Sequence, residues 1–293
     1  MRILLTGADG FTGRPFEALA RRAGHEVIAL RADLTNAQAL AAEVLSVRPE
    51  AVVHLAGIAF VGHAHEEAFY NVNVVGTTNL LDALSNLRQP PKMVLLASSA
   101  NVYGNCEQSP IVEEQPLSPV NHYAMSKLAM ELMARTYASK LSIVITRPFN
   151  YTGPGQDEAF VVPKLAKHFA LRSPVVELGN LHVEREFNDV RMVCDAYLHL
   201  LDIGQPGETY NVCSGRPYKL QDVIDVLSRL SGHSIKTVVN PAFVRSNEVT
   251  RLCGSPGKLL DLLARHGQSI EMPTLEDTLS RVLCNAVSEI NSQ

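Results

Sequence analysis

The arrangement of apolar residues along the first half of this chain restricts its fold more than any other feature of the sequence. Short apolar runs alternate with longer amphipathic stretches. The runs predict strands at residues 2–6, 26–30, 51–55, 93–98 and 142–147, and the stretches predict helices at residues 12–23, 36–46, 66–86 and 122–140. Continuous apolar strands separated by helices are typical of a parallel sheet that is covered on both faces. The sequence therefore predicts an α/β fold with a doubly wound parallel sheet.

The pattern changes after residue 150. A Gly-Pro-Gly run interrupts it, and helices dominate at residues 160–171 and beyond residue 219. A strand-like run at residues 208–212 indicates that the chain returns to the sheet. We expect a nucleotide-binding domain and a smaller, partly interleaved C-terminal lobe for the substrate. The first comprises residues 1–150, with 180–213 returning to it, and the second comprises residues 151–179 and 214–293.

Composition excludes several classes of protein. Hydrophobic residues make up 46% of the 293 residues and charged residues 19%, as in ordinary folded proteins. A net charge of -4 argues against a nucleic-acid-binding protein. The five cysteines are scattered without a Cys-x-x-Cys pair, so neither disulfides nor a metal site is indicated. Because the chain also shows no signal-peptide pattern and no apolar run long enough for a bilayer, we expect a cytoplasmic protein that binds no membrane.

A glycine-rich loop follows the first predicted strand and opens the first predicted helix. Its glycines, Gly7, Gly10 and Gly13, are spaced one residue wider at the start than in the common dinucleotide fingerprint. Such glycines allow a tight turn, a close approach of backbone to a pyrophosphate, and close packing of helix on strand. The helix N-terminus then offers unpaired N–H groups to the phosphates. We therefore expect the loop, including Phe11 and Thr12, to bind a dinucleotide.

The residues after the second predicted strand bear on which dinucleotide is bound. Arg31 stands there, followed by Asp33 and Leu34. An arginine at that place can pair with a ribose 2′-phosphate, whereas an aspartate would hydrogen-bond the hydroxyl of NAD. The sequence favours NADPH, with NADH as the alternative.

Tyr123 and Lys127 lie four residues apart in a predicted helix, which places them on one face, about one turn apart. A nearby ammonium favours the phenolate and lowers the pKa of a phenol. The pair can therefore exchange a proton with an alcohol or a carbonyl. Ser99 follows the fourth predicted strand, at the edge where ligands bind in open α/β sheets, and can hydrogen-bond the reacting oxygen.

The glycine loop, Ser99 and the Tyr-x-x-x-Lys motif together resemble the extended short-chain dehydrogenase/reductase superfamily, over essentially the whole chain. The resemblance implies that Ser99, Tyr123 and Lys127 are the catalytic trio, with Lys127 also holding the nicotinamide ribose. It further implies cofactor contacts from Leu55, Ala56, Gly57 and Pro148. Relatives often form homodimers through the helices at 66–86 and 122–140.

The segment at residues 147–156 resembles the nucleotide-sugar branch of that superfamily. Segments farther on resemble GDP-mannose 4,6-dehydratases and GDP-4-keto-6-deoxymannose reductases. The implied substrate contacts are Asn150 and Ser99, the phosphate-binding residues Lys164, Arg185 and Arg245, and Glu248 at the ribose. A few dedicated cations are needed where an acidic protein binds a pyrophosphate. Met192 stands where relatives usually carry Asp, and the chain lacks the C-terminal Trp-x-Pro of many relatives.

The residue at position 101 distinguishes the dehydratases from the reductases. The dehydratases carry an acidic residue where this chain has Asn101, and an amide cannot do acid–base chemistry. We therefore expect reduction of the 4-keto group of a nucleotide-linked 4-keto-6-deoxyhexose, giving GDP-D-rhamnose from GDP-4-keto-6-deoxymannose. The alternatives are a reductase that gives a 6-deoxytalose nucleotide, on GDP or dTDP, a 4-epimerase with tightly held NAD, and a nucleotide-sensing protein with a vestigial site.

Overall fold

The computed structural model of the protein describes residues 1–59, 65–244 and 249–292. Within these ranges a parallel sheet contains six strands in the order β10–β5–β4–β3–β1–β2. The order reverses at β1 and β3, as in doubly wound folds, so the predicted fold class is confirmed. The strands are β1 (Arg2–Thr6), β2 (Glu26–Ala29), β3 (Ala51–His54), β4 (Met93–Ala97), β5 (Ile143–Pro148) and β10 (Thr209–Val212).

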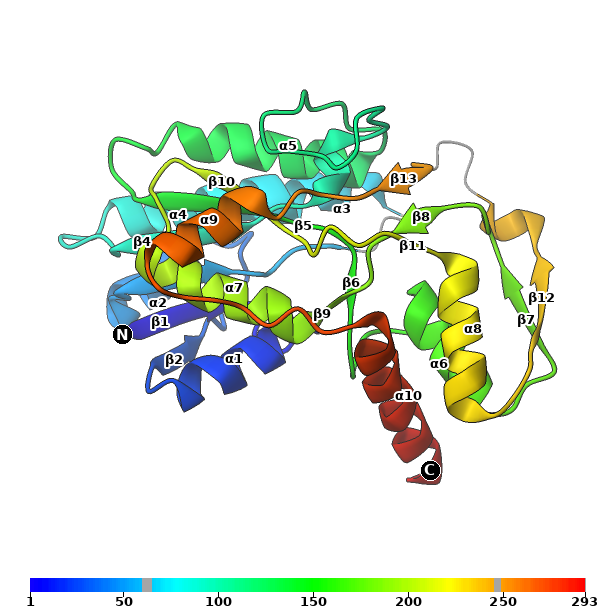
Figure 1. Cartoon of the computed structure of the whole chain (residues 1–293). Helices are drawn as coiled ribbons and strands as arrows, with labels where there is room; N and C mark the ends of the chain where they lie inside the picture. The colour runs from blue at the N-terminus through cyan, green and yellow to red at the C-terminus, as the bar shows by residue number, and fades with distance from the viewer. Residues whose placement is uncertain (60–64, 245–248, 293) are drawn as a thin grey trace.

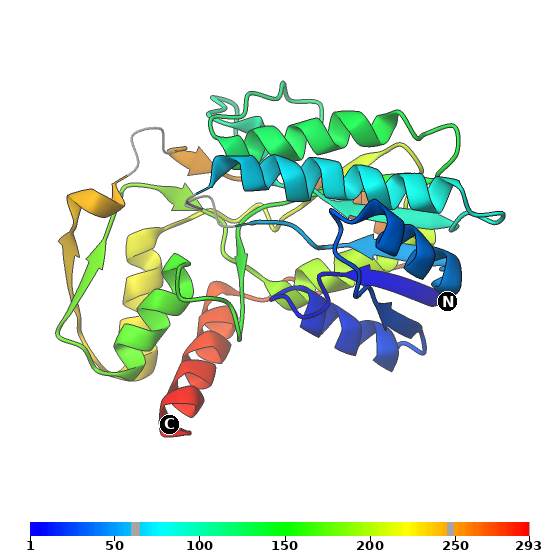
Figure 2. The same ribbon diagram turned by 180° about the vertical axis from the view of Figure 1, so that it is seen from behind.

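Helices cover both faces of this sheet (Figure 1). Side chains of a strand alternate between the faces, so Ile3 and Leu5 enter one buried cluster and Leu4 the other. The first cluster lies under α1 (Gly13–Arg22), α7 (Val190–Ile203) and α9 (Gly257–Arg265). The second lies under α2 (Ala37–Val47), α4 (Thr77–Ser85) and α5 (His122–Arg135). Figure 2 shows α4 and α5 side by side on the outer layer.

Two predicted helices differ from the observed ones. The helix expected at 66–86 consists of α3 (Glu66–Tyr70), a π-helical segment (Asn71–Gly76) and α4. The helix expected at 122–140 ends at Arg135, where the backbone changes to tighter bonds such as that from the Thr136 N–H to the Met133 carbonyl, and residues 136–140 form turns. The π segment matters for the site, since such wide turns often occur at functional positions.

The C-terminal lobe packs three helices around its own apolar cluster: α6 (Val161–Ala170), α8 (Leu220–Ser231) and α10 (Leu275–Asn291). A two-stranded sheet of β7 (Val175–Leu178) and β12 (Lys236–Val239) lies at its outer side (Figures 1 and 2). A second small sheet joins β11 (Tyr218–Lys219), β8 (Glu184–Arg185) and β13 (Arg251–Leu252). Near the junction with the large sheet, β6 (Tyr151–Thr152) pairs with β9 (Asn188–Asp189). Short 3₁₀ helices occur at Ala100–Tyr103 and Pro241–Phe243.

The chain crosses between the two parts more often than the predicted division states. Helix α9 packs against α7 and β10 through Leu259, Leu262 and Leu263, although the division puts 214–293 with the smaller lobe. Met192 lies in the same apolar cluster, 2% exposed, so a carboxylate there would have to be buried.

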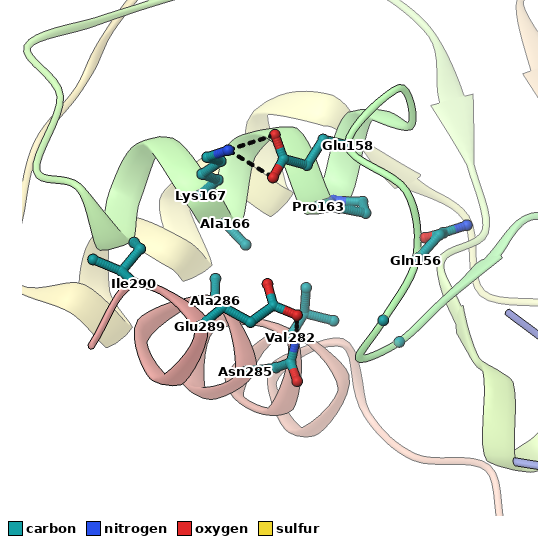
Figure 3. Close-up of a pocket in the computed structure, with 12 residues that line it drawn as sticks. Gln156, Glu158, Pro163, Ala166, Lys167, Val282, Asn285, Ala286, Glu289 and Ile290 are labelled. Atoms are coloured by element: carbon teal, nitrogen blue, oxygen red, sulfur yellow. Dashed lines mark hydrogen bonds and ion pairs between the residues drawn. The ribbon is translucent and has the colours of Figure 1, made fainter. Parts of the chain in front are cut away.

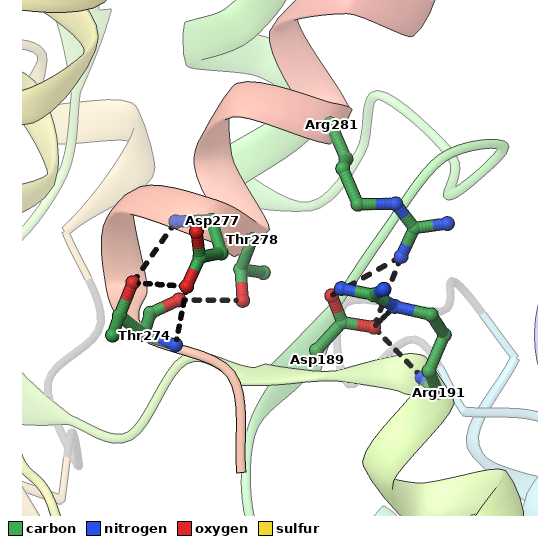
Figure 4. Close-up of polar contacts among 6 residues, drawn as sticks. All are labelled: Asp189, Arg191, Thr274, Asp277, Thr278 and Arg281. Atoms are coloured by element: carbon green, nitrogen blue, oxygen red, sulfur yellow. Dashed lines mark hydrogen bonds and ion pairs between the residues drawn. The ribbon is translucent and has the colours of Figure 1, made fainter. Parts of the chain in front are cut away.

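Two buried carboxylates connect the lobe with the large sheet. Asp189 caps α7 and accepts hydrogen bonds from Arg191 and from Arg281 of α10 (Figure 4). Glu186, 0% exposed, accepts hydrogen bonds from the backbone of Ser214 and Gly254. Both buried carboxylates therefore have hydrogen-bond donors, which offset the free-energy cost of burying a charge.

Candidate active site

The glycine loop has a backbone that only glycine fits. Gly7 has φ +69°, a left-handed conformation that disfavours other residues. Its carbonyl accepts from the Gly10 N–H at 3.0 Å. A Cβ at Gly13 would lie 2.0 Å from the Gly7 oxygen. The loop is therefore compact, and it delivers the chain into the first turn of α1.

The N-terminus of α1 is suited to anions. In the described structure Thr12 makes no side-chain cap, and the first turn holds no acidic residue. Unpaired N–H groups and the positive end of the helix dipole therefore point out of the loop. Phe11 stacks on Tyr151 with ring centroids 5.8 Å apart, and the Thr12 and Tyr151 hydroxyls are 2.8 Å apart. The loop thus fits the pyrophosphate of a dinucleotide, and Tyr151 is a neighbour that sequence reasoning missed.

The end of β3 lies against this loop. The Thr6 hydroxyl accepts from the N–H groups of Leu55 and Ala56, at 3.1 and 3.0 Å. A Cβ at Gly7 would lie 2.8 Å from the Ala56 nitrogen. At Gly57 a Cβ would lie 3.4 Å from Lys127 Nζ. The structure therefore brings the residues predicted at the end of β3 together with the glycine loop and with Lys127.

The residues after β2 also reach the loop. The exposed Arg31 guanidinium lies 3.4 Å from the Asp9 carboxylate, within the loop. Asp33 accepts from the N–H and hydroxyl of Thr35, each at 2.8 Å, which lowers the pKa of Asp33. Leu34 is buried, and a Cβ at Gly76 would lie 2.8 Å from it. Arg31 therefore presents its positive charge to solvent beside the loop, whereas the Asp33 carboxylate is hydrogen-bonded to Thr35 and Leu34 is buried.

Ser99, Tyr123 and Lys127 lie together where β4 ends. Asn121 caps α5 by accepting from the Ala124 N–H at 2.9 Å, so Tyr123 stands in the first turn. The Ser99 side chain lies close enough to the Tyr123 phenol to lower its pKa. Lys127 Nζ donates to the carbonyl of Ala97 at 2.8 Å. All three predicted catalytic side chains are at most 7% exposed.

Burial sets the protonation of this group. It raises the pKa of Tyr123, and the Ser99 side chain opposes that rise. It lowers the pKa of Lys127 to about 8, while the negative charge of Glu131 opposes the fall. His54, whose pKa burial lowers to about 3, is neutral. The expected lowering of the Tyr123 pKa by Lys127 is not found, because burial outweighs other effects on the phenol. At neutral pH the site thus holds a protonated phenol and an ammonium one turn away.

Two asparagines near the trio have defined partners. The Asn101 backbone N–H and side-chain amide each donate to the Ser99 hydroxyl oxygen at 3.2 Å. Asn101 thus orients Ser99. In the π segment, the side-chain oxygen of Asn73 accepts from the Ile58 N–H at 3.0 Å. The side-chain NH₂ of Asn73 donates to the Ser126 hydroxyl at 3.0 Å. Asn73 lies between Val72 and Val74 and is buried, and sequence reasoning assigned it no role.

The predicted substrate residues lie in different surroundings. The carbonyl of Asn150 accepts from Asn188 at 3.0 Å. Lys164 donates to the carbonyl of Glu177 at 2.7 Å, and its ammonium lies 4.3 Å from the centre of the Phe243 ring. Arg185 is 8% exposed and donates to the carbonyls of Glu184 and Val249. Arg245 and Glu248 lie outside the described residues. Pro148 ends β5, buried beside Val212.

A hollow lies between α6 and α10 (Figure 3). Lys167 and Glu158 form an ion pair at 2.7 Å on one side of it, and Asn285 and Glu289 of α10 face them. No residue of the catalytic trio lines this hollow. Among the described residues, no His, Cys, Asp and Glu side chains gather to hold a metal ion. None of the helices described is both long and apolar enough to span a membrane.

Comparison with known proteins identifies the family. Residues 3–213 match the model of the NAD dependent epimerase/dehydratase family, and the chain belongs to that family. The predicted membership of the extended short-chain dehydrogenases/reductases is thereby confirmed. The protein is accordingly an enzyme of an NAD(P)-dependent family.

Three proteins illustrate what the chain is similar to. The GDP-6-deoxy-D-talose 4-dehydrogenase of Aggregatibacter actinomycetemcomitans is 33% identical, over 99% of this chain and 100% of that protein. The GDP-6-deoxy-D-mannose reductase of Pseudomonas aeruginosa is 34% identical, over 100% and 99%. The structure of Pseudomonas aeruginosa RMD complexed with NADPH superposes with a TM-score of 0.89 at 33% identity, covering 98% and 99% of the two chains.

Proposed function

We propose that this enzyme uses NADPH to reduce the 4-keto group of a GDP-linked 4-keto-6-deoxyhexose. The arrangement of Tyr123, Ser99 and Lys127 at the end of β4 carries the proposal, since a buried phenol beside a hydroxyl and an ammonium suits protonation of an alkoxide. Both curated relatives are named for GDP-6-deoxyhexoses and one for a 4-position. These names favour GDP over dTDP or UDP.

The residues of the chain have separate tasks in this mechanism. The nicotinamide, when bound, supplies the hydride that attacks C4 of the sugar. Tyr123 donates its proton to the alkoxide that forms, Ser99 hydrogen-bonds that oxygen, and Lys127 stabilises the phenolate left on Tyr123. Asn101 keeps the Ser99 oxygen in place through its two hydrogen bonds. The Asn101 amide cannot remove a proton at C5, so dehydration is not part of the proposal.

For the product we propose GDP-D-rhamnose, which is GDP-6-deoxymannose. The second candidate is GDP-6-deoxytalose, because the relative from Aggregatibacter carries that name. The two sugars differ in configuration at C4, so they require hydride delivery to opposite faces of the same ketone. The residues predicted to hold the nucleotide, Asn150, Lys164, Arg185, Arg245 and Glu248, remain part of the proposal.

A panel of GDP-, dTDP- and UDP-linked 4-keto sugars with NADPH and NADH tests the function. We expect turnover with GDP-4-keto-6-deoxymannose and NADPH, and NMR of the product then gives the C4 configuration. NAD that copurifies with the protein, together with turnover in the absence of added cofactor, would instead establish an epimerase.

Replacing Arg31 with Ala should raise the KM for NADPH by about tenfold to a hundredfold. A charged hydrogen bond of about 1.5–3 kcal/mol to the 2′-phosphate would be lost. The KM for NADH should stay nearly constant, because NADH has no such phosphate. Arg22→Ala, at the opposite end of α1, serves as the control for loss of one exposed positive charge. Equal effects on both cofactors would contradict the assigned role of Arg31.

We also propose a homodimer built on α5 and the neighbouring helix. Met125 and Leu132 are 44% and 52% exposed and lie seven residues apart, on one face of α5. Val75, on the adjoining π segment, is 47% exposed. Figure 2 shows this layer along the outside of the sheet. A second copy of the chain is the occupant that the resemblance indicates for this apolar surface.

The double substitution Met125→Glu and Leu132→Glu should convert the dimer to a monomer, because two carboxylates cannot be buried without partners. Light scattering after size-exclusion chromatography measures the change. Leu45→Glu, on an exposed position of α2, is the matched control and should leave the mass unchanged. A monomeric native protein, or a double variant that stays dimeric, would show that this surface is not the interface.

The free cysteines support a reducing location, and a cytoplasmic enzyme is part of the proposal. Cys194, Cys213 and Cys253 are buried, and burial raises the pKa of each thiol, so these three are unreactive packing residues.

A further inference from the structure

A buried carboxylate stands next to the catalytic pair and has no part in the mechanism so far. Glu131 follows Lys127 by about one helical turn on α5 and is 0% exposed. Arg147 donates to both its oxygens, from Nε to Oε1 at 3.0 Å and from Nη2 to Oε2 at 2.7 Å. The Ser98 hydroxyl donates to Oε1 at 2.5 Å. Three donors on one carboxylate hold it in one position.

The partners of Glu131 come from the elements that carry the site. Ser98 directly precedes the predicted catalytic serine after β4, and Arg147 lies near the end of β5. Lys127 donates to the carbonyl of Ala97, the residue before Ser98. Glu131 therefore joins the helix of the catalytic tyrosine and lysine to the strand end that carries the serine.

Besides joining α5 to the end of β4, Glu131 influences the charge of Lys127. The titratable groups on the elements around Lys127 are Tyr123 and Glu131 on α5, His54 on β3 and Arg147 on β5, and of these Glu131 and His54 interact electrostatically with Lys127. His54 and Tyr123 are neutral at physiological pH, and Arg147 is a like charge held on the carboxylate. Glu131 thus supplies the one negative charge among these described neighbours. It is this charge that opposes the loss of the Lys127 proton caused by burial.

Arg147 is itself well satisfied, which makes the carboxylate stable in the interior. Besides Glu131, its Nη1 donates to the Tyr103 hydroxyl at 2.9 Å and to the Glu113 carbonyl at 3.2 Å. The Tyr103 hydroxyl in turn donates to the Asn211 side chain at 2.7 Å. A buried ion pair with such partners keeps its geometry, and breaking it by removing one member is costly.

We propose that Glu131 is a positioning residue that keeps Lys127 cationic and directed at the end of β4, without touching substrate or cofactor. The proposal rests on the role of Lys127 in the proposed reduction. It goes beyond a structural ion pair, because Glu131 and Arg147 could hold α5 on β5 without any effect on Lys127.

The proposal is tested with Glu131→Gln, which keeps the shape of the side chain and removes its charge. The protein is labelled with ¹³C-lysine, and NMR follows the titration of Lys127, whose signal is assigned from Lys127→Arg. In the native protein the midpoint is expected near pH 8. In Glu131→Gln it should fall by about one unit or more, as removal of an opposite charge one helical turn away predicts. An unchanged midpoint would overturn the proposal.

Kinetics give the second readout. The Lys127 cation is present below its pKa and is lost as the pH rises through it, so activity should fall on the alkaline side. In Glu131→Gln this decline should begin at lower pH by the same interval, with the KM for the keto sugar unchanged. Glu276→Gln removes an exposed carboxylate paired with Arg229 and should leave the profile as in the native protein. A general loss of rate without a shifted profile would mark Glu131 as structural only.

If Glu131→Gln does not fold, Glu131→Asp provides a second test of the proposal. Glu131→Asp retains the charge and withdraws it by one methylene, so it should shift the Lys127 midpoint downward by less and restore most of the rate. A folded Glu131→Asp that loses the rate while its Lys127 midpoint stays at the native value would overturn the proposal. The NMR titration uses no substrate, so it tests Glu131 even if the panel of keto sugars shows no turnover.

Discussion

Replacing Tyr123 with Phe should lower kcat by about 10²- to 10⁴-fold, the range that a positioned general acid contributes. The substitution removes one oxygen atom and with it the proton donor, while the buried ring keeps its packing against Phe69. Binding of NADPH should remain, because the glycine loop and the end of β3 are untouched. Stopped-flow or steady-state oxidation of NADPH with the keto sugar measures the loss.

Tyr137→Phe is the matched control for Tyr123. It also removes a single phenolic hydroxyl, here one that donates to Asp82 at 2.7 Å beyond the other end of α5. Its rate should equal that of the native protein. A Tyr123→Phe variant that still oxidises NADPH at the native rate would show that the proton comes from another group.

The second large effect is expected at the glycine loop. In Gly13→Ala the new Cβ would meet backbone atoms, 2.0 Å from the Gly7 oxygen and 2.7 Å from the Ala8 Cα. Backbone cannot yield as a flexible side chain does, so the loop must open. Overpacking of this kind costs about 1–3 kcal/mol or more, which corresponds to a loss in NADPH affinity of about fivefold to a hundredfold or greater. Fluorescence titration with NADPH measures the change.

Gly257→Ala is the control for Gly13→Ala. At Gly257, the first residue of α9, a Cβ would have its nearest contact at 3.4 Å, with the Ser255 hydroxyl. Affinity for NADPH should be native there. If Gly13→Ala bound NADPH as tightly as the native protein, the loop would not be the pyrophosphate site.

Local patterns in the sequence predict the large sheet well. Each strand from β1 to β5 is a compact apolar run, and the glycine loop lies where the first strand meets the first helix. Helix α7 was not predicted, although its buried residues Val193, Tyr197 and Leu200 recur with helical spacing and mark one face. The paired segments β8, β11 and β13 are two residues long and come from distant parts of the chain, so no local pattern marks them.

In the site, too, the residues in local sequence motifs were predicted, whereas the contacts between residues far apart in the chain were not. Spacing along α5 indicated Tyr123 and Lys127, and the place of Ser99 followed from the strand before it. The contact between Thr12 and Tyr151 joins residues 139 positions apart, and no motif encodes it. The pairing of Glu131 with Arg147 likewise depends on how α5 packs on β5.

The most direct test of the central claim follows an isotope. NADPH that carries deuterium at the transferred position of C4 is incubated with the enzyme and GDP-4-keto-6-deoxymannose, and the product is examined by NMR. The proposed reaction predicts one deuterium at C4 of the 6-deoxyhexose, with one NADPH oxidised per product, and both effects absent in Tyr123→Phe. Product without deuterium at C4, or turnover without oxidation of NADPH, would contradict it.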